Sequence, residues 1–313
     1  MATRERRLTV DLSPPRALLL ANPKSRSGGD PDTVAGLLRE AGLDPLCPAM
    51  DDRDTAALIR AHAGKVDRVV LAGGDGTMNA AAPALLETGL PFAIIPLGTG
   101  NDLARTLGVP EDPAEAARVA AEGRLRAIDV ALANDVPFFN VASIGFGVEL
   151  TRALTRDAKR RWGKLGYAVA AARVLARMRP FSATIRCGDE VVRSRTIHVA
   201  VGNGRHYGGG LTVSPGASID DHVLDVYAVT QGRLREHVSI ARLLRTGHLV
   251  EHERVHHLTA RRIRLVTDEP LDVNLDGEVA ATTPATFEVD RNALHVVVPA
   301  QSRAARMDGT TSP

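Results

Sequence analysis

The N-terminal part of the chain, up to about residue 125, alternates short apolar runs with helical patterns. Runs at residues 17–21, 68–72 and 92–95 have the length and composition of buried strands. The helical patterns begin near Asp30, with Pro31 in the first turn, and cover residues 54–63, 79–88, 102–107 and 114–122. Strands that alternate with helices predict a parallel sheet with helices on both faces.

The pattern changes near Asp129, beyond which strand-like runs dominate. These runs lie at residues 130–133, 138–142, 182–187, 196–201, 224–229, 262–266, 271–275, 285–289 and 294–298, with helical patterns at 161–178 and 233–243. Many strands separated by polar turns predict a β-rich, sandwich-like domain. We therefore expect an α/β domain over residues 12–127, a β-rich domain over 128–300 and a flexible tail over 301–313. The last strands could also return to the first domain.

Composition excludes several classes of protein. Hydrophobic residues make up 44% and charged residues 24% of the 313 residues, which suffices for a packed core without disulfides or a structural metal. The net charge of +2 argues against bulk electrostatic binding to nucleic acid. Cys47 and Cys187 lie far apart without metal-ligand spacing, so we expect free thiols in a reducing cytosol. The histidines also lack ligand spacing, and we expect them on the surface.

The N-terminal residues are charged, and no apolar stretch that would indicate a signal peptide follows them. The apolar runs are strand-length, far short of the roughly 18 residues that a membrane-spanning helix needs. The sequence therefore predicts a cytoplasmic protein whose membrane contacts are peripheral.

Three loops rich in Gly, Asn and Thr follow predicted strands, at residues 21–29, 71–79 and 96–105. Open α/β sheets bind ligands at such positions. Glycines let the backbone take positive φ and let phosphate oxygens approach the amides closely. Helices that open at Met78 and Asp102 would direct free N–H groups at the anion, and the Thr77 and Thr99 hydroxyls could add donors. One such loop could be only a tight turn, but three in one sheet indicate phosphate binding.

Asp75 is the unusual residue in the second loop, Gly73-Gly74-Asp75-Gly76-Thr77. A carboxylate among phosphates makes sense only if a divalent cation lies between them. Neither the Walker A pattern nor the dinucleotide fingerprint is matched.

These motifs resemble the catalytic domain of the diacylglycerol kinase family, in particular its soluble bacterial lipid kinases. The resemblance rests on residues 73–77, on Asn22-Pro23 with Ser25, and on residues 98–105, where Leu103 replaces the usual Phe. It continues through Gly208-Gly209-Gly210, Pro215, Asp220-Asp221 and residues 224–226 to Asp276-Gly277-Glu278. His222 follows Asp221 where the family more often has Gly.

The resemblance implies a nucleotide-binding α/β domain, a β-sandwich and an active site in the cleft between them. It implies that Asp75 acts on the Mg²⁺ bridging the ATP phosphates, that Asp102 and Asp129 extend this acidic network, and that Glu278 is the general base. Asp221, with Asp220, resembles a structural Mg²⁺ site, although an Asp-rich turn explains them equally well. The residues expected to hold the nucleotide are Asn22, Pro23, Ser25, Gly73, Gly74, Gly76, Thr77, Asn79, Gly98, Thr99 and Asn101.

Residues 151–179 carry nine basic residues against the single acid Asp157, with Trp162 and Tyr167 among them. Such a segment is typical either of a helix on an anionic membrane surface or of a solvated helix face.

The implied reaction moves the γ-phosphoryl group of ATP to the hydroxyl of diacylglycerol, giving phosphatidic acid at the inner membrane face. The alternatives are a kinase for sphingoid bases or other lipid alcohols, an NAD kinase and a nucleotide-binding sensor without catalysis. A homodimer is the default assembly.

Overall fold

The structure is a computed structural model that describes residues 14–22, 30–49, 54–153, 173–174, 177–204, 206–207, 211–212, 217–232 and 252–302. The expected helix at 233–243, most of that at 161–178, and the glycines 208–210 lie outside these residues.

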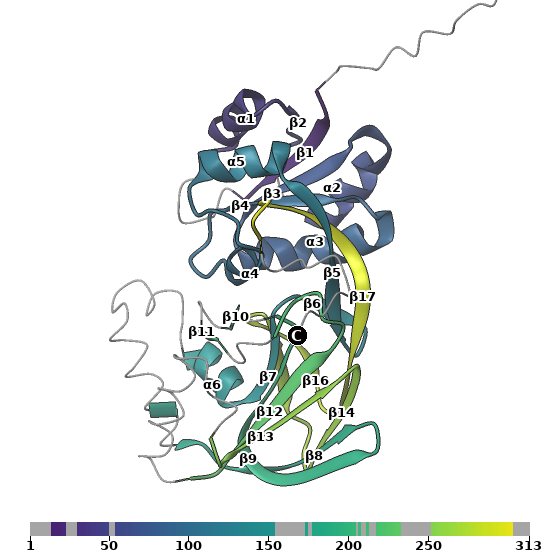
Figure 1. The fold of residues 1–313 in the computed structure, drawn as a ribbon. Coiled ribbons are helices and arrows are strands. Elements are labelled where there is room, and N and C mark those ends of the chain that lie inside the picture. Colours follow the sequence, from purple (N-terminus) through teal and green to yellow (C-terminus); the bar gives the residue numbers. More distant parts are fainter. Residues whose placement is uncertain are drawn as a thin grey trace, which may run out of the picture.

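The first domain is a parallel sheet in the order β4-β3-β1-β2, covered by helices on both faces as predicted (Figure 1). Helices α1 and α5 pack against each other, and α2 packs against α3. The bounds are β1 Arg16–Ala21, α1 Pro31–Glu40, β2 Asp44–Leu46, α2 Thr55–His62, η1 Ala63–Lys65, β3 Arg68–Gly73, α3 Asp75–Thr88, β4 Phe92–Pro96, α4 Asp102–Leu107 and α5 Pro113–Glu122.

Local signals determine most of these helix starts. Asp30 caps α1 by accepting a hydrogen bond from the Thr33 amide at 3.2 Å, with Pro31 in the first turn. Helix α3 instead begins at Asp75, earlier than residue 79 where the helical pattern was read. The glycine loop itself therefore forms the first turn of α3.

The second domain is built on antiparallel strands in the order β16-β15-β7-β9-β8-β14, with β12 and β13 alongside β9. The bounds are β6 Val136–Phe138, β7 Val141–Gly145, α6 Phe146–Ala153, β8 Phe181–Cys187, β9 Glu190–Gly202, β10 His206–Tyr207, β11 Leu211–Thr212, β12 Leu224–Thr230, β13 Val255–Ala260, β14 Arg262–Thr267, β15 Asp272–Leu275 and β16 Glu278–Thr282. Its core is separate from that of the first domain.

Two long strands connect the domains. β5 (Arg124–Ala133) pairs antiparallel with β17 (Ala285–Val298), and β17 also pairs in parallel with β4 of the first domain. The strands expected at 285–289 and 294–298 are thus one strand with an irregularity between Asp290 and Leu294, and the chain does return to the first domain. In Figure 1 this ribbon runs along one side of both domains.

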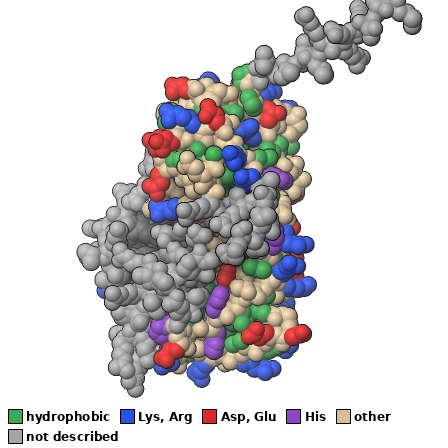
Figure 2. Space-filling model, in the orientation of Figure 1, with side chains coloured by type: hydrophobic (Ala, Val, Ile, Leu, Met, Phe, Trp, Pro, Cys, Tyr) green, Lys and Arg blue, Asp and Glu red, His purple; other side chains and the backbone are tan. Residues whose placement is uncertain are grey.

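Several elements differ from the sequence prediction. The strand expected at 138–142 is divided into β6 and β7, and β2, α6, β13 and β16 were not expected. Cys47 and Cys187 are free thiols, as predicted. Within the described residues, no helix is long and apolar enough to cross a membrane. Figure 2 shows basic and acidic side chains interspersed over the α/β domain, in keeping with the small net charge.

Candidate active site

Two glycine loops, after β3 and after β4, pack backbone against backbone. A Cβ on Gly98 would lie 2.5 Å from the Cα of Gly74 and 2.7 Å from Oδ1 of Asn101. The Asn101 side chain closes the second loop, because Oδ1 accepts from the Gly98 amide at 2.9 Å and Nδ2 donates to the Gly98 carbonyl at 3.0 Å. Asn101 holds this arrangement with φ +53, which asparagine tolerates better than most residues.

The first turn of α3 offers free amides to a ligand. Its first intrahelical bonds run from the Thr77 and Met78 amides to the Gly74 carbonyl, so the Asp75 and Gly76 amides precede the hydrogen-bonded ladder. Gly74 has no side chain to cap them. The positive end of this 14-residue helix therefore faces the loop, as expected for a phosphate site.

The polar residues around this turn have divided roles. Thr77 is buried, and its hydroxyl lies 3.5 Å from Nδ2 of Asn22, which joins the end of β1 to α3. Thr99 is exposed at the tip of its loop. Oδ1 of Asn79 is buried without a hydrogen-bond partner among the described residues. Pro23 and Ser25 lie outside the described residues.

Asp75 and Asp102 form a carboxylate pair beside these loops. A Cβ on Gly100 would lie 2.8 Å from Oδ2 of Asp75 and 3.9 Å from Oδ2 of Asp102. Burial raises the pKa of Asp75, and the negative charge of Asp102 raises it further. Backbone amides of α4 oppose this rise, including that of Leu103, which donates to Oδ1 of Asp75 at 3.3 Å. The first turn of α4 therefore binds a side-chain carboxylate, whereas the sequence predicted that it would point at the nucleotide.

The turn between β15 and β16 carries Glu278 to the glycine loop. Asp276 and Gly277 have φ +47 and +103, values that fit a tight two-residue hairpin turn. The exposed Glu278 carboxylate reaches α3, since its Oε1 lies 3.6 Å from where a Cβ on Gly76 would be. The structure thus brings Glu278, from the second domain, next to the glycine loop of the first.

Asp276 anchors this turn. From the sequence, Asp276 was identified only as part of a motif. Its carboxylate accepts hydrogen bonds from the amides of Phe139 at 2.7 Å, Asn140 at 3.0 Å and Val141 at 2.8 Å. Burial raises the pKa of Asp276 to about 6 despite these bonds, and the charge of Asp75 adds to the rise. The same Asp-Gly pair is the signal for a hairpin, but the amides that bind Asp276 come from a distant segment.

The residues present fit a Mg²⁺ ion held jointly with phosphates. Asp75 makes no ion pair with any described residue, so its charge is left for a cation. The described residues contain no group of three His, Cys, Asp or Glu that could hold a metal by themselves. Mg²⁺ commonly takes one or two carboxylates and completes its shell with phosphate oxygens and water, which matches the pair Asp75 and Asp102.

Asp129 is hydrogen-bonded to His222 and Asn292, and its part in an aspartate network with Asp75 stays a prediction. It is 1% exposed; Oδ2 accepts from the His222 amide and Oδ1 from the Asn292 amide, both at 2.8 Å. The His222 ring nitrogen Nδ1 lies 2.9 Å from Oδ1. Asn292, with φ +52, lies in the irregular part of β17. Asp129 therefore connects β5 to the bend of β17 and to the loop before β12, and no hydrogen bond or ion pair among the described residues joins it to Asp75.

His222 has φ +63, the left-handed region that glycine adopts freely. A glycine at this position would adopt the conformation without strain. The contact between its ring and Asp129 offsets the backbone strain here.

Asp221 lies in the same loop. Its carboxylate accepts from the amides of Ser218 at 2.9 Å and Val223 at 3.1 Å. Burial raises the pKa of Asp221 to about 6, with smaller contributions from Asp225 and Asp129. These bonds are those of an Asp-rich turn; the structural Mg²⁺ site stays a prediction.

The prediction that the histidines lie on the surface was wrong for His198. His198 is buried beside Phe146 and Tyr227, with Nδ1 3.1 Å from the Ile144 carbonyl. Burial lowers its pKa to about 4. His257 lies 2.7 Å from the carboxylate of Asp225. The apolar run that surrounds His198 in β9 is fully buried and could have indicated this inward position.

Comparisons with known proteins match both parts of the chain to described families. Residues 16–133 match the family described as "Diacylglycerol kinase catalytic domain", and residues 141–298 match the "YegS C-terminal NAD kinase beta sandwich-like domain". A diacylglycerol kinase of Bacillus subtilis is 29% identical, over 81% of this chain and 84% of that relative. A "Probable lipid kinase YegS-like" of Stenotrophomonas maltophilia is 32% identical, over 85% of this chain and 91% of that relative.

Solved structures share the fold. The crystal structure of a diacylglycerol kinase from Bacillus anthracis superposes with a TM-score of 0.70 at 26% identity, covering 91% of this chain and 97% of that one. Both halves of the chain, and their order, thus match known proteins. The chain therefore belongs to the family of diacylglycerol kinases and YegS-like lipid kinases.

Proposed function

We propose that this lipid kinase transfers the γ-phosphoryl group of ATP to the hydroxyl of diacylglycerol, giving phosphatidic acid. The observation that carries the proposal is the position of Glu278, whose exposed carboxylate reaches Gly76 in the first turn of α3. The glycine loops alone would be sufficient to bind a phosphate. A carboxylate beside it, from another domain, supplies what transfer to an alcohol additionally requires.

In this proposal the chain positions ATP and the lipid hydroxyl and accepts the proton that the hydroxyl loses. The free amides at the start of α3 hold phosphate oxygens. Asp75 and Asp102 would hold Mg²⁺, which neutralises charge on the phosphates. The lipid hydroxyl oxygen forms the new bond to the γ-phosphorus, the bond from the γ-phosphorus to ADP breaks, and Glu278 accepts the hydroxyl proton. General-base help of this kind is worth about 10²–10⁴-fold in rate.

The proposed reaction also implies the cofactors and a contact with the membrane. ATP and Mg²⁺ are the proposed nucleotide and metal, and the substrate lipid requires peripheral contact with the inner face of the cytoplasmic membrane. A sphingoid base or another lipid alcohol would use the same chemistry, so the choice of diacylglycerol is tested separately.

Two variants test the transfer itself. Glu278→Gln should lower kcat by about 10²–10⁴-fold and leave the unfolding temperature unchanged, because the side chain is exposed. Asp75→Asn should abolish Mg²⁺-dependent turnover. Glu190→Gln, at an exposed position at the start of β9, is the matched control. Wild-type turnover in folded Glu278→Gln protein would refute the assignment of the base.

The substrate is tested by incubation with labelled ATP and diacylglycerol, sphingosine, ceramide or NAD. Labelled phosphatidic acid as the main product supports the proposal. Labelling of sphingosine or ceramide alone would show that the substrate is another lipid alcohol, phosphorylated by the same mechanism. Labelling of NAD alone would point to an NAD kinase. No labelled product would favour a nucleotide-binding sensor.

A further inference from the structure

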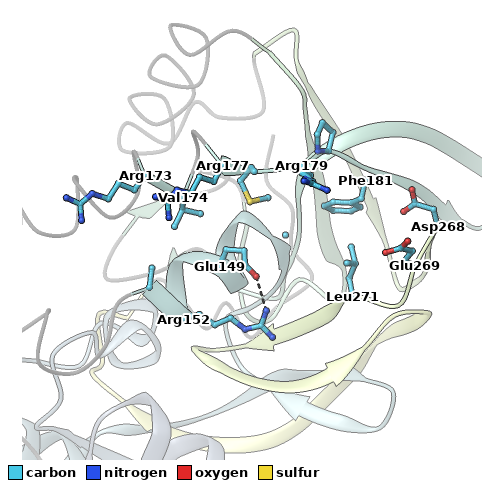
Figure 3. A pocket seen from close by; sticks show the side chains of 14 residues that line it. Glu149, Arg152, Arg173, Val174, Arg177, Arg179, Phe181, Asp268, Glu269 and Leu271 are labelled. Carbon is cyan, nitrogen blue, oxygen red and sulfur yellow. Dashed lines mark hydrogen bonds and ion pairs between the residues drawn. The ribbon is translucent and has the colours of Figure 1, made fainter.

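A second cavity lies in the β-rich domain, away from the glycine loops. It has a volume of about 880 Å³ and is lined by the end of α6, residues 173–174 and 177–180, the start of β8 and the loop between β14 and β15 (Figure 3). Leu271 lines it just before β15, whereas Asp276 follows the other end of that strand. Five residues of extended chain span about 16 Å, so the cavity is separate from the site around Glu278.

Opposite charges line opposite sides of this cavity. Arg177 and Arg179 lie on one side, and Asp268 and Glu269 on the other, with Phe181 between them in Figure 3. Glu149 and Arg152 also line the cavity, and they form an ion pair with each other. Arg173 lines it as a further basic residue. The two arginines are exposed and make no ion pair with any described residue. The acidic side is therefore not neutralised by the basic side across the cavity.

Hydrogen bonds position the acidic side. The Asp268 carboxylate accepts from the Ser182 amide at 3.2 Å, and the Asp268 amide donates to the Ser182 carbonyl at 3.2 Å. This bond lowers the pKa of Asp268, so the group is ionised at neutral pH. The Thr267 hydroxyl donates to the Glu269 carbonyl at 2.6 Å, which fixes the backbone of the next residue. The Glu269 carboxylate makes no hydrogen bond with a described residue.

The cavity also has an apolar part. Phe181 is only 8% exposed, and Leu271 is partly buried against the core of the domain. A basic side fits a phosphate, an acidic side fits an ammonium group, and the apolar surface between them fits hydrocarbon. The cavity therefore matches a molecule that carries all three. Simple anions would leave Asp268 and Glu269 facing like charge, at a cost in affinity.

We propose that this cavity binds the headgroup of a membrane phospholipid that carries a primary ammonium, of the phosphoethanolamine type. The phosphate lies on Arg177 and Arg179, the ammonium donates hydrogen bonds to Asp268 and Glu269, and the first carbons of the lipid lie against Phe181 and Leu271. The protein would thereby recognise a bilayer lipid that is not its substrate. A trimethylammonium headgroup fits poorly, because it has no N–H to donate to the carboxylates.

Vesicle co-sedimentation of the full chain tests this site. The vesicles consist of phosphatidylcholine alone, or of phosphatidylcholine with phosphatidylethanolamine or with phosphatidylglycerol. We expect the strongest partitioning to the phosphatidylethanolamine vesicles, and soluble glycerophosphoethanolamine should release the protein. Equal binding to phosphatidylcholine and phosphatidylethanolamine, or no vesicle binding, would overturn the proposal.

Substitutions test the acidic side and the basic side of the cavity separately. Glu269→Gln should weaken binding to phosphatidylethanolamine vesicles about tenfold, the value of one hydrogen bond to a charged group, and leave phosphatidylglycerol binding no weaker. Arg177→Gln with Arg179→Gln should weaken both. Glu190→Gln with Arg193→Gln, on the exposed part of β9, is the matched control and should change neither. Unchanged phosphatidylethanolamine binding by folded Glu269→Gln protein would refute the role of the acidic side. Preferential binding of the wild type to phosphatidylglycerol would show a site for anions instead.

Discussion

Replacing Gly98 by alanine tests whether the contact between the two glycine loops builds the proposed nucleotide site. The new methyl group would lie 2.5 Å from the Cα of Gly74 and 2.7 Å from Oδ1 of Asn101. Unstrained carbon atoms stay about 3.5–4.0 Å apart, so the loops must separate by roughly 1 Å. Neither neighbour can move aside easily. The contact at Gly74 is with the backbone, and the Asn101 side chain is held by hydrogen bonds to Gly98 itself.

We expect Gly98→Ala to lower the free energy of unfolding by about 1–3 kcal/mol, the usual cost of overpacking. Displacement of Gly74 moves the first turn of α3, so the KM for ATP should rise more than the KM for the lipid. Urea unfolding and initial rates at varied ATP measure the two effects. Gly36→Ala is the control: nothing lies within 4 Å of its added methyl, and alanine in place of glycine inside α1 should stabilise by about 1 kcal/mol. Wild-type stability and KM for ATP in Gly98→Ala would refute the reasoning.

Three further predictions concern the β-rich domain and the strands that join it to the first. Asp129→Ala leaves the amides of His222 and Asn292 without their acceptor and should cost about 2–5 kcal/mol of unfolding free energy; an unchanged urea midpoint would contradict this role. His222→Gly relieves a strained φ by about 1 kcal/mol but loses the ring contact to Asp129, so we expect a small net loss, and a clear gain in stability would show that the contact contributes nothing. His198 has a folded-state pKa of about 4, below its unfolded value of 6.5, so the unfolded chain takes up its proton first. The wild type should therefore lose up to about 3 kcal/mol from this residue as the pH falls from 6.5 to 4. His198→Asn should lack this component of the pH dependence, while the exposed-site control His295→Asn should keep it.

Much of the first domain could be predicted from sequence because its signals are local. Asp30 followed by Pro31 determines the start of α1 within one turn of chain, and the strand-length apolar runs before the glycine loops became β3 and β4. Boundaries were less certain where a glycine loop merges with a helix. The glycines around Asp75 suggested a loop, but the backbone continues directly into α3, whose N-cap Gly74 lies against Gly98 of the other loop.

Prediction was weaker in the second domain, where strand pairing decides the elements. β16 is almost wholly exposed and lacks the alternation that marks a half-buried strand, so nothing in its own residues indicated it. β17 looked like two strands, because only its partners, β14, β5 and β4, show that the irregular stretch belongs to one element.

The sequence by itself determined the glycine loops and the carboxylates beside them, since each depends on neighbouring residues. Only the tertiary structure decided which of these groups meet. It placed Glu278 on Gly76, directed the first turn of α4 to Asp75, and engaged Asp129 with His222 and Asn292. The physical reason is that such contacts join segments far apart in the chain, and their formation depends on the packing of whole domains, not on the propensity of any one residue.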